Sequence, residues 1–90
     1  MRVIRKLLPS DGPSYEEHLL RLDADDRRFR FAGGIGPDAV RAHCARIDWF
    51  RAVLLGAFEN GALRGAAELR FDGAPPGGAE LALSVERDRQ

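Results

Sequence analysis

An Asn60–Gly61 pair between two apolar stretches constrains the fold of this 90-residue chain more than any other sequence feature. Asn and Gly readily adopt the positive φ angles that a two-residue hairpin turn requires. The stretch before the pair, residues 53–58, is continuously apolar as in a buried strand, and a second strand-like stretch runs from Leu63 to about Phe71. The pair therefore predicts an antiparallel hairpin in the second half of the chain.

Two further strands are predicted, one toward each end of the chain. Residues 3–8 place apolar side chains among basic ones and stop at Pro9, which ends the strand. Toward the other end, a Pro- and Gly-rich loop at residues 72–78 precedes an apolar stretch at 79–85. The last three strands then form an antiparallel meander.

Two amphipathic helices are predicted between the first and second strands. The first begins after a capping signal at residues 10–13. The second begins at Pro37 and ends near Asp48 or Trp49. Apolar residues at helical spacing form their buried faces: Tyr15, His18, Leu19 and Leu22 in the first helix, and Val40, Cys44 and Ile47 in the second.

The segment between the two helices, residues 24–31, mixes acids with arginines and runs into a glycine-rich stretch. This composition predicts an irregular connection rather than a helix or strand. Its cations, Arg27, Arg28 and Arg30, follow three aspartates, so we expect a neutral, solvated cluster of charges.

The predicted order of elements is strand, helix, helix, strand, strand, strand, in a single domain that spans residues 1–90. The fold class is α/β, more narrowly α+β, because a mainly antiparallel sheet of about four strands carries its helices on one face. Trp49 and Phe50 are predicted to pack in the core beneath the second helix.

Charge and cysteine content exclude several classes of function. Fourteen Lys and Arg balance fourteen Asp and Glu, so the chain lacks the basic field that attracts nucleic acids or anionic membranes. No apolar run approaches the ~18 residues of a membrane span, and the single Cys44 leaves no intramolecular disulfide. These features predict a cytoplasmic protein without nucleic-acid or membrane partners. No metal site is predicted, because His18 and His43 have no acid or cysteine at ligand spacing.

Five segments of the chain match a known family when they are taken together. They are Ile4 to Leu8 with Asp11, the Arg30-Phe31 pair, Gly56-Ala57-Phe58 with its Asn-Gly turn, Leu63 to Glu68, and residues 79–85. With the predicted order of elements, they resemble the N-terminal half of the GCN5-related N-acetyltransferase (GNAT) superfamily. The resemblance implies an N-acetyltransferase that transfers an acetyl group from its co-substrate acetyl-CoA to an amine of a small molecule or protein. It also implies that residues 1–90 are the N-terminal portion of such a domain, truncated at the cofactor loop.

The resemblance also implies which residues bind acetyl-CoA. Leu83, Ser84 and Val85 match the family segment whose backbone contacts the acyl and pantetheine part of the cofactor. Arg89-Gln90 resembles the start of the loop that holds the pyrophosphate at a helix N-terminus. Gln90 is therefore a further cofactor-binding candidate.

Two carboxylates are candidate catalytic residues, because the acceptor amine must lose a proton during acyl transfer. Glu80 is the first candidate for the base, since it lies on the strand that borders the cofactor in the family. Glu68, on the neighbouring strand, is the second candidate. The alternative for Glu80 is a solvated or ion-paired strand carboxylate, and the alternative for Glu68 is a cross-strand pair with an arginine.

A second function of a different class stays open at this point. Under this second hypothesis, the chain is a catalytically inactive, truncated GNAT fragment that acts as an oligomerisation or interaction module. Its last strand has no neighbour on one side, and an open strand edge favours pairing with another chain. This hypothesis predicts a homo-oligomer that associates through residues 79–85.

Overall fold

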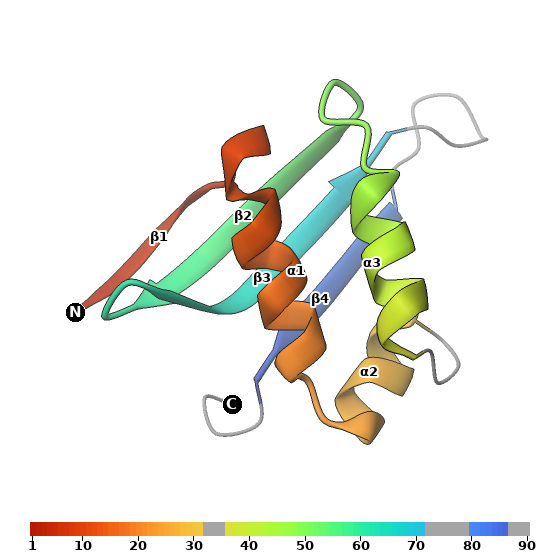
Figure 1. Ribbon diagram of the computed structural model, residues 1–90. Helices are drawn as coiled ribbons and strands as arrows, with labels where there is room; N and C mark the ends of the chain where they lie inside the picture. Colours follow the sequence, from red (N-terminus) through yellow and green to blue (C-terminus); the bar gives the residue numbers. More distant parts are fainter. Residues whose placement is uncertain (32–35, 72–79, 87–90) are drawn as a thin grey trace.

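The computed structural model describes residues 1–31, 36–71 and 80–86, which form a four-stranded antiparallel sheet with helices packed on one side (Figure 1). The strands follow one another across the sheet in the order β1-β2-β3-β4. The α+β class predicted from the sequence is confirmed. In chain order the elements are β1 (Arg2–Lys6), a 3-10 turn (Pro9–Asp11), α1 (Gly12–Arg21), α2 (Ala24–Phe31), α3 (Pro37–Ala45), β2 (Ala52–Glu59), β3 (Ala62–Arg70) and β4 (Glu80–Val85).

The Asn60–Gly61 turn joins β2 to β3, as predicted. Both residues have positive φ angles, 51° and 86°, and Glu59 pairs with Ala62 beside the turn. The turn also holds the amino end of the chain, because Asn60 Oδ1 accepts a hydrogen bond from the Met1 amino group at 2.8 Å. The hairpin and β1 are therefore tied together at this end of the sheet.

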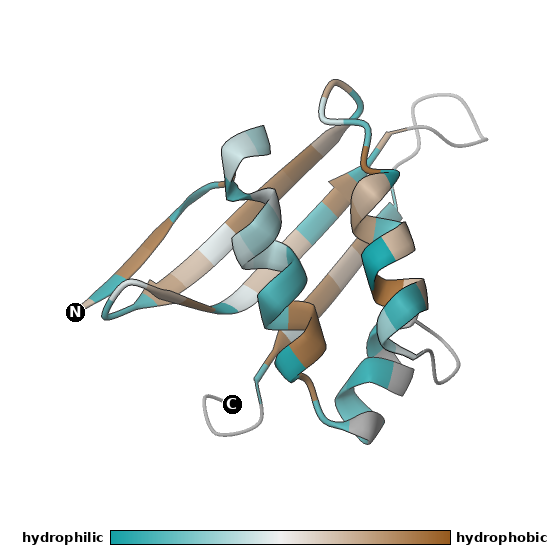
Figure 2. Cartoon of the chain, in the orientation of Figure 1, coloured by the Kyte–Doolittle hydropathy of each residue, from teal (hydrophilic) through white to brown (hydrophobic). Residues whose placement is uncertain are grey.

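The hydrophobic core lies between the sheet and the two helices α1 and α3. Leu19 of α1, Val40 of α3 and Leu54 of β2 are fully buried and belong to one cluster. Tyr15 and His18 lie on the same inner face of α1 and are also fully buried, as their spacing predicts. Hydrophobic residues run along β2 and β4, whereas hydrophilic residues cover much of the helices (Figure 2).

Residues Ala24–Phe31, which we predicted to be an irregular connection, form helix α2. Asp23 caps the start of this helix, because its Oδ1 accepts the N–H of Asp26 at 2.9 Å. Arg27 donates hydrogen bonds to two carbonyl groups at the end of α1. The expectation of a solvated arginine cluster is wrong for Arg27 and Arg30, because both side chains are held by tertiary contacts.

The prediction that Phe50 packs in the core is also wrong, whereas Trp49 does pack against it. The Phe50 side chain is 101% exposed in the connection between α3 and β2. Asp48 holds this connection as a turn, because its Oδ1 accepts the Phe50 N–H at 3.0 Å and its carbonyl accepts the Arg51 N–H at 2.9 Å. Helix α3 ends at Ala45, earlier than predicted, and leaves room for that turn.

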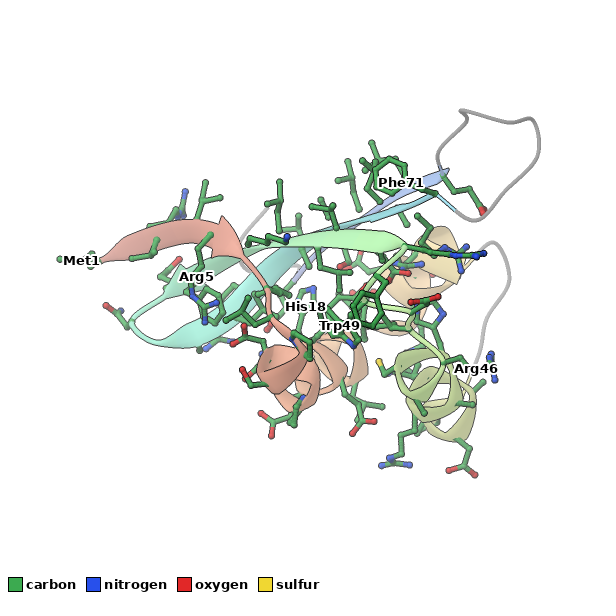
Figure 3. The ribbon with its side chains drawn as sticks, turned by 90° about the horizontal axis from the view of Figure 1, so that it is seen from above. Met1, Arg5, His18, Arg46, Trp49 and Phe71 are labelled. Carbon is green, nitrogen blue, oxygen red and sulfur yellow. The ribbon has the colours of Figure 1, made fainter. Side chains whose placement is uncertain are left out.

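The face of the sheet opposite the helices carries exposed apolar side chains. Leu55, Leu81 and Leu83 share this face by strand alternation and are 45%, 60% and 56% exposed. Phe71, 48% exposed, stands on the same side, away from the helices (Figure 3). We call these four residues the open sheet face, because none of the described segments covers it. No helix in the described part of the chain has the length and apolar character needed to span a membrane.

Candidate functional site

Strand β4 forms one edge of the sheet, and the described residues pair it with β3 alone. Directly after β4, Glu86 donates its N–H to the carbonyl of Arg64 at 3.0 Å. Hydrogen-bonded pairs alternate along an antiparallel ladder. The register therefore directs the backbone N–H and C=O groups of Leu81 and Leu83 away from β3, toward the open edge, and those of Ser84 toward β3.

The three consecutive residues predicted to bind the cofactor are divided between the two faces of the sheet. Leu83 and Val85 expose their side chains on the face away from the helices, whereas Ser84 is buried beneath α1. Leu83 therefore combines an outward backbone with an accessible side chain. A cofactor contact by Leu83, Ser84 or Val85 stays a prediction.

His18 links α1 to the end of β4 through a buried polar cluster. Its Nε2 lies 2.9 Å from Ser84 Oγ, and its Nδ1 lies 3.1 Å from Glu86 Oε2. Arg21 and Arg64 pair with the same carboxylate at 3.1 and 2.8 Å. Burial lowers the pKa of His18, although Glu86 opposes this effect. Ser84, His18 and Glu86 have the order of a hydrolytic triad, but each is at most 6% exposed, so the cluster serves to fasten α1 to β4.

Glu68 forms a second buried cluster, on β3, and is 1% exposed. Its Oε1 accepts hydrogen bonds from the Tyr15 hydroxyl at 2.5 Å and Arg30 Nη2 at 2.6 Å, and it lies 3.0 Å from His43 Nε2. Burial raises the pKa of Glu68, but hydrogen bonds from His43 and Tyr15 and the charges of His43 and Arg30 outweigh it and lower this pKa to about 2. Ionised Glu68 therefore joins α1, α2 and α3 to the sheet.

Sequence reasoning missed the partners of Glu68. It expected an arginine on the adjacent strand, but Arg30 belongs to α2, and the other partners belong to α1 and α3. The helical spacing predicts only that Tyr15 is buried, and it assigns no role to His43. The available signal was the Arg30-Phe31 pair, which the family resemblance had already singled out.

Glu80 begins β4 and is the more accessible of the two candidate catalytic carboxylates. Its side chain is 75% exposed and pairs with Arg70 Nη2 at 3.1 Å, as its structural alternative predicts. The Nε of the same Arg70 lies 3.7 Å from Glu68 Oε2. One guanidinium thus stands between the two carboxylates, and only Glu80 meets solvent. A catalytic role for either residue stays a prediction.

Some of the predicted features lie outside the described residues. These are Gln90, the loop at residues 72–78, and the side chain of Arg28. Within the segments that the structure does describe, no group of three or more His, Cys, Asp or Glu side chains is arranged to hold a metal ion.

The sequence and the structure were compared with known proteins, and only the structure finds matches. No family model matches the sequence, and a search of curated proteins finds no match. The structure matches the GNAT domain of S. lividans PAT with a TM-score of 0.72 and 18% identity, over 97% of this chain and 55% of that chain. It matches an acetyltransferase of the GNAT family from Streptococcus pneumoniae with a TM-score of 0.64 and 18% identity, over 98% of this chain and 56% of that chain. It also matches the PaiA N-acetyltransferase from Thermoplasma acidophilum in complex with coenzyme A, with a TM-score of 0.58 and 21% identity, over 98% of this chain and 60% of that chain.

These likenesses define an acetyltransferase-type fold. More particularly, the chain has the fold of part of a GNAT domain, which confirms the fold resemblance seen in the sequence. The chain spans between 55% and 60% of the length of the solved chains that it matches.

Proposed function

We propose that this chain is part of an N-acyltransferase that transfers an acetyl group from acetyl-CoA to an amine. The observation that carries the proposal is the open edge of β4 in a GNAT fold, where Leu81 and Leu83 direct backbone groups outward. One structure of similar fold is described as a complex with coenzyme A. The acceptor is an amine of a small molecule or protein, and the free Cys44 supports a cytoplasmic location.

The edge of β4 suits the extended arm of coenzyme A. Amide groups along that arm can pair with an open strand edge in the way that an added strand does. Leu81 and Leu83 present such backbone groups about 7 Å apart, one full strand repeat, and their exposed side chains add apolar surface. When bound there, acetyl-CoA supplies an activated acyl thioester.

Glu80 is the better of the two candidates for taking the proton that the amine loses. It is exposed at the start of β4 and is paired with one arginine. Glu68 already accepts hydrogen bonds at Oε1, and a carboxylate with a pKa of about 2 has little affinity for a proton. We therefore assign proton acceptance to Glu80, directly or through water, and a positioning role to Glu68.

Calorimetric titration of acetyl-CoA into the purified chain tests the proposed cofactor edge. We expect saturable binding that Leu83→Pro weakens at least tenfold, because proline removes the outward N–H yet is tolerated on an edge strand. Leu83→Ala is the matched control, since it trims the side chain and keeps the N–H. Absence of binding, or equal affinity of the two variants, would contradict the proposed edge.

Acetyl transfer to an amine tests the role of Glu80. Loss of a general base slows such a reaction by about 10²–10⁴-fold, so Glu80→Gln is expected to lower kcat by that factor. Glu59→Gln is the matched control, because Glu59 also pairs with an arginine, Arg2 at 3.5 Å, but lies on β2 beside the opposite edge strand. Equal rates for both variants would remove Glu80 from the mechanism.

A second candidate function is self-association, and the open sheet face is the observation that favours it. Contiguous exposed apolar residues and an open strand edge both favour contact between chains. Light scattering at increasing concentration is expected to show a homo-oligomer that Leu83→Lys dissociates. Phe50→Lys is the control, since Phe50 is also apolar and exposed but lies outside the open sheet face. A monomer at every concentration would exclude this function.

A further inference from the structure

A small cavity lies beside the buried carboxylate of Glu68, near the end of α3. Its volume is about 110 Å³, and its lining includes His43, Arg46, Arg51 and Arg70 besides Glu68. These residues come from α3, the connection after it and β3. Figure 3 shows Arg46 on the helix side of the sheet, the side on which Glu68 is buried.

Glu68, which lines this cavity, has one carboxylate oxygen that none of the described residues satisfies. Its Oε1 accepts the hydrogen bonds from the three helices, whereas its buried Oε2 has no hydrogen-bond partner among the described residues. Arg70 Nε, 3.7 Å away, is too distant for a hydrogen bond. A buried, ionised oxygen without a donor is costly. The site therefore favours a ligand that donates a hydrogen bond to Oε2.

The lining of the cavity also favours an anion. Arg46 forms no ion pair within the described part of the chain, and Arg51 reaches Asp48 only at 3.9 Å. With Arg70, three guanidinium groups line a cavity that contains two carboxylates, Asp48 and Glu68. Arginine is well suited to bind a carboxylate through paired hydrogen bonds.

We propose that this cavity binds a small molecule that carries both an amine and a carboxylate, such as an amino acid, with the amine on Glu68 and the carboxylate on Arg46 and Arg51. The cavity volume of about 110 Å³ equals that of about four water molecules at about 30 Å³ each, which restricts the ligand to the smallest amino acids, such as glycine.

This molecule would also be the acceptor of the acyl group, and that part of the inference rests on the proposed function. Ala82 of β4 stands directly opposite Glu68 of β3. Neighbouring strands are about 4.8 Å apart, so Glu68 lies one strand away from the edge that would hold the thioester. The binding itself does not depend on acyl transfer.

Titration of the ¹⁵N-labelled chain with glycine, followed by NMR, tests the binding. We expect saturable shifts of the backbone amides that line the cavity, those of Ala52 and Arg70 included. Methylamine and acetate each carry one of the two groups of glycine, so each should bind at least tenfold more weakly. Absence of saturable shifts up to 100 mM glycine, or acetate that binds as well as glycine, would overturn the proposal.

Two exposed arginines provide the matched variants, Arg46 directly after α3 and Arg41 in the middle of that helix. Arg46→Gln is expected to weaken glycine binding at least tenfold, because it removes the proposed carboxylate contact. Arg41→Gln should leave the affinity unchanged, since Arg41 pairs with Asp38 on the outer side of α3. Equal effects of the two variants would overturn the assignment. Both side chains are exposed, so neither change is expected to unfold the chain.

The same labelled sample separates this inference from the proposed function. Acetyl-CoA is added alone, and the amides of Leu81 and Leu83 report on the β4 edge. Glycine shifts without acetyl-CoA shifts would support the cavity and contradict the acyltransferase proposal. Acetyl-CoA shifts without glycine shifts would support the acyltransferase and overturn the amino-acid site.

Discussion

Glu68→Gln is expected to lower the free energy of unfolding by about 3 kcal/mol at pH 7. The ordinary pKa of this carboxyl group is 4.5, and its surroundings lower it to about 2 in the folded chain. One pKa unit corresponds to about 1.4 kcal/mol, and the removal of one partner from a buried ion pair costs about 3–5 kcal/mol. The pKa shift and the cost of breaking the ion pair therefore correspond to a similar loss of stability.

The effect of this substitution should depend on pH in a defined direction. Because the folded-state pKa of Glu68 is lower than its unfolded-state value, the stabilisation is complete above about pH 4.5 and is lost as the pH falls toward 2. The stability difference between the native sequence and Glu68→Gln should therefore shrink from about 3 kcal/mol at pH 7 to about 1 kcal/mol at pH 3.

Urea unfolding followed by circular dichroism at both pH values measures this difference. Glu17→Gln is the control, since Glu17 is exposed on α1 and its substitution should cost less than about 0.5 kcal/mol. If Glu68→Gln does not fold, Tyr15→Phe tests the same cluster more gently, because it removes one hydrogen bond of 2.5 Å and should cost about 1–2 kcal/mol. A loss below 1 kcal/mol for Glu68→Gln, or a loss that does not shrink with acid, would refute this reasoning.

Two glycine substitutions test the backbone of the hairpin. In Gly56→Val, the new Cβ would come within 2.7 Å of the buried side chains of Leu63 and Leu7, so thermal unfolding should show a loss of about 1–3 kcal/mol. Gly61→Ala should cost about 1 kcal/mol in the same assay, since φ at Gly61 is 86°. Gly12→Ala, where a Cβ meets nothing within 4 Å, should be neutral or stabilising, and equal losses at Gly61 and Gly12 would contradict the positive-φ argument.

The candidate site could be predicted from sequence only in part. Glu80 and Leu83 could be proposed as site residues because their strand has a clear local pattern and a family resemblance, and their roles stay predictions. The ion pair between Glu68 and Arg30 joins residues that are 38 positions apart, and no local periodicity reports on such a pair. The same holds for Glu86, which was not singled out although it accepts hydrogen bonds from Arg21 and Arg64.

The amino-acid sequence by itself determined the elements whose formation depends on near neighbours. The Asn60–Gly61 turn follows from two residues that tolerate positive φ, and the inner face of α1 follows from helical spacing. Tertiary structure alone decided that residues Ala24–Phe31 become a helix and that Phe50 faces solvent. The physical reason is that the Arg30 side chain in this charged segment is stabilised by an ion pair with the buried carboxylate of Glu68 on a distant strand. That carboxylate is in place only once the sheet and helices have packed.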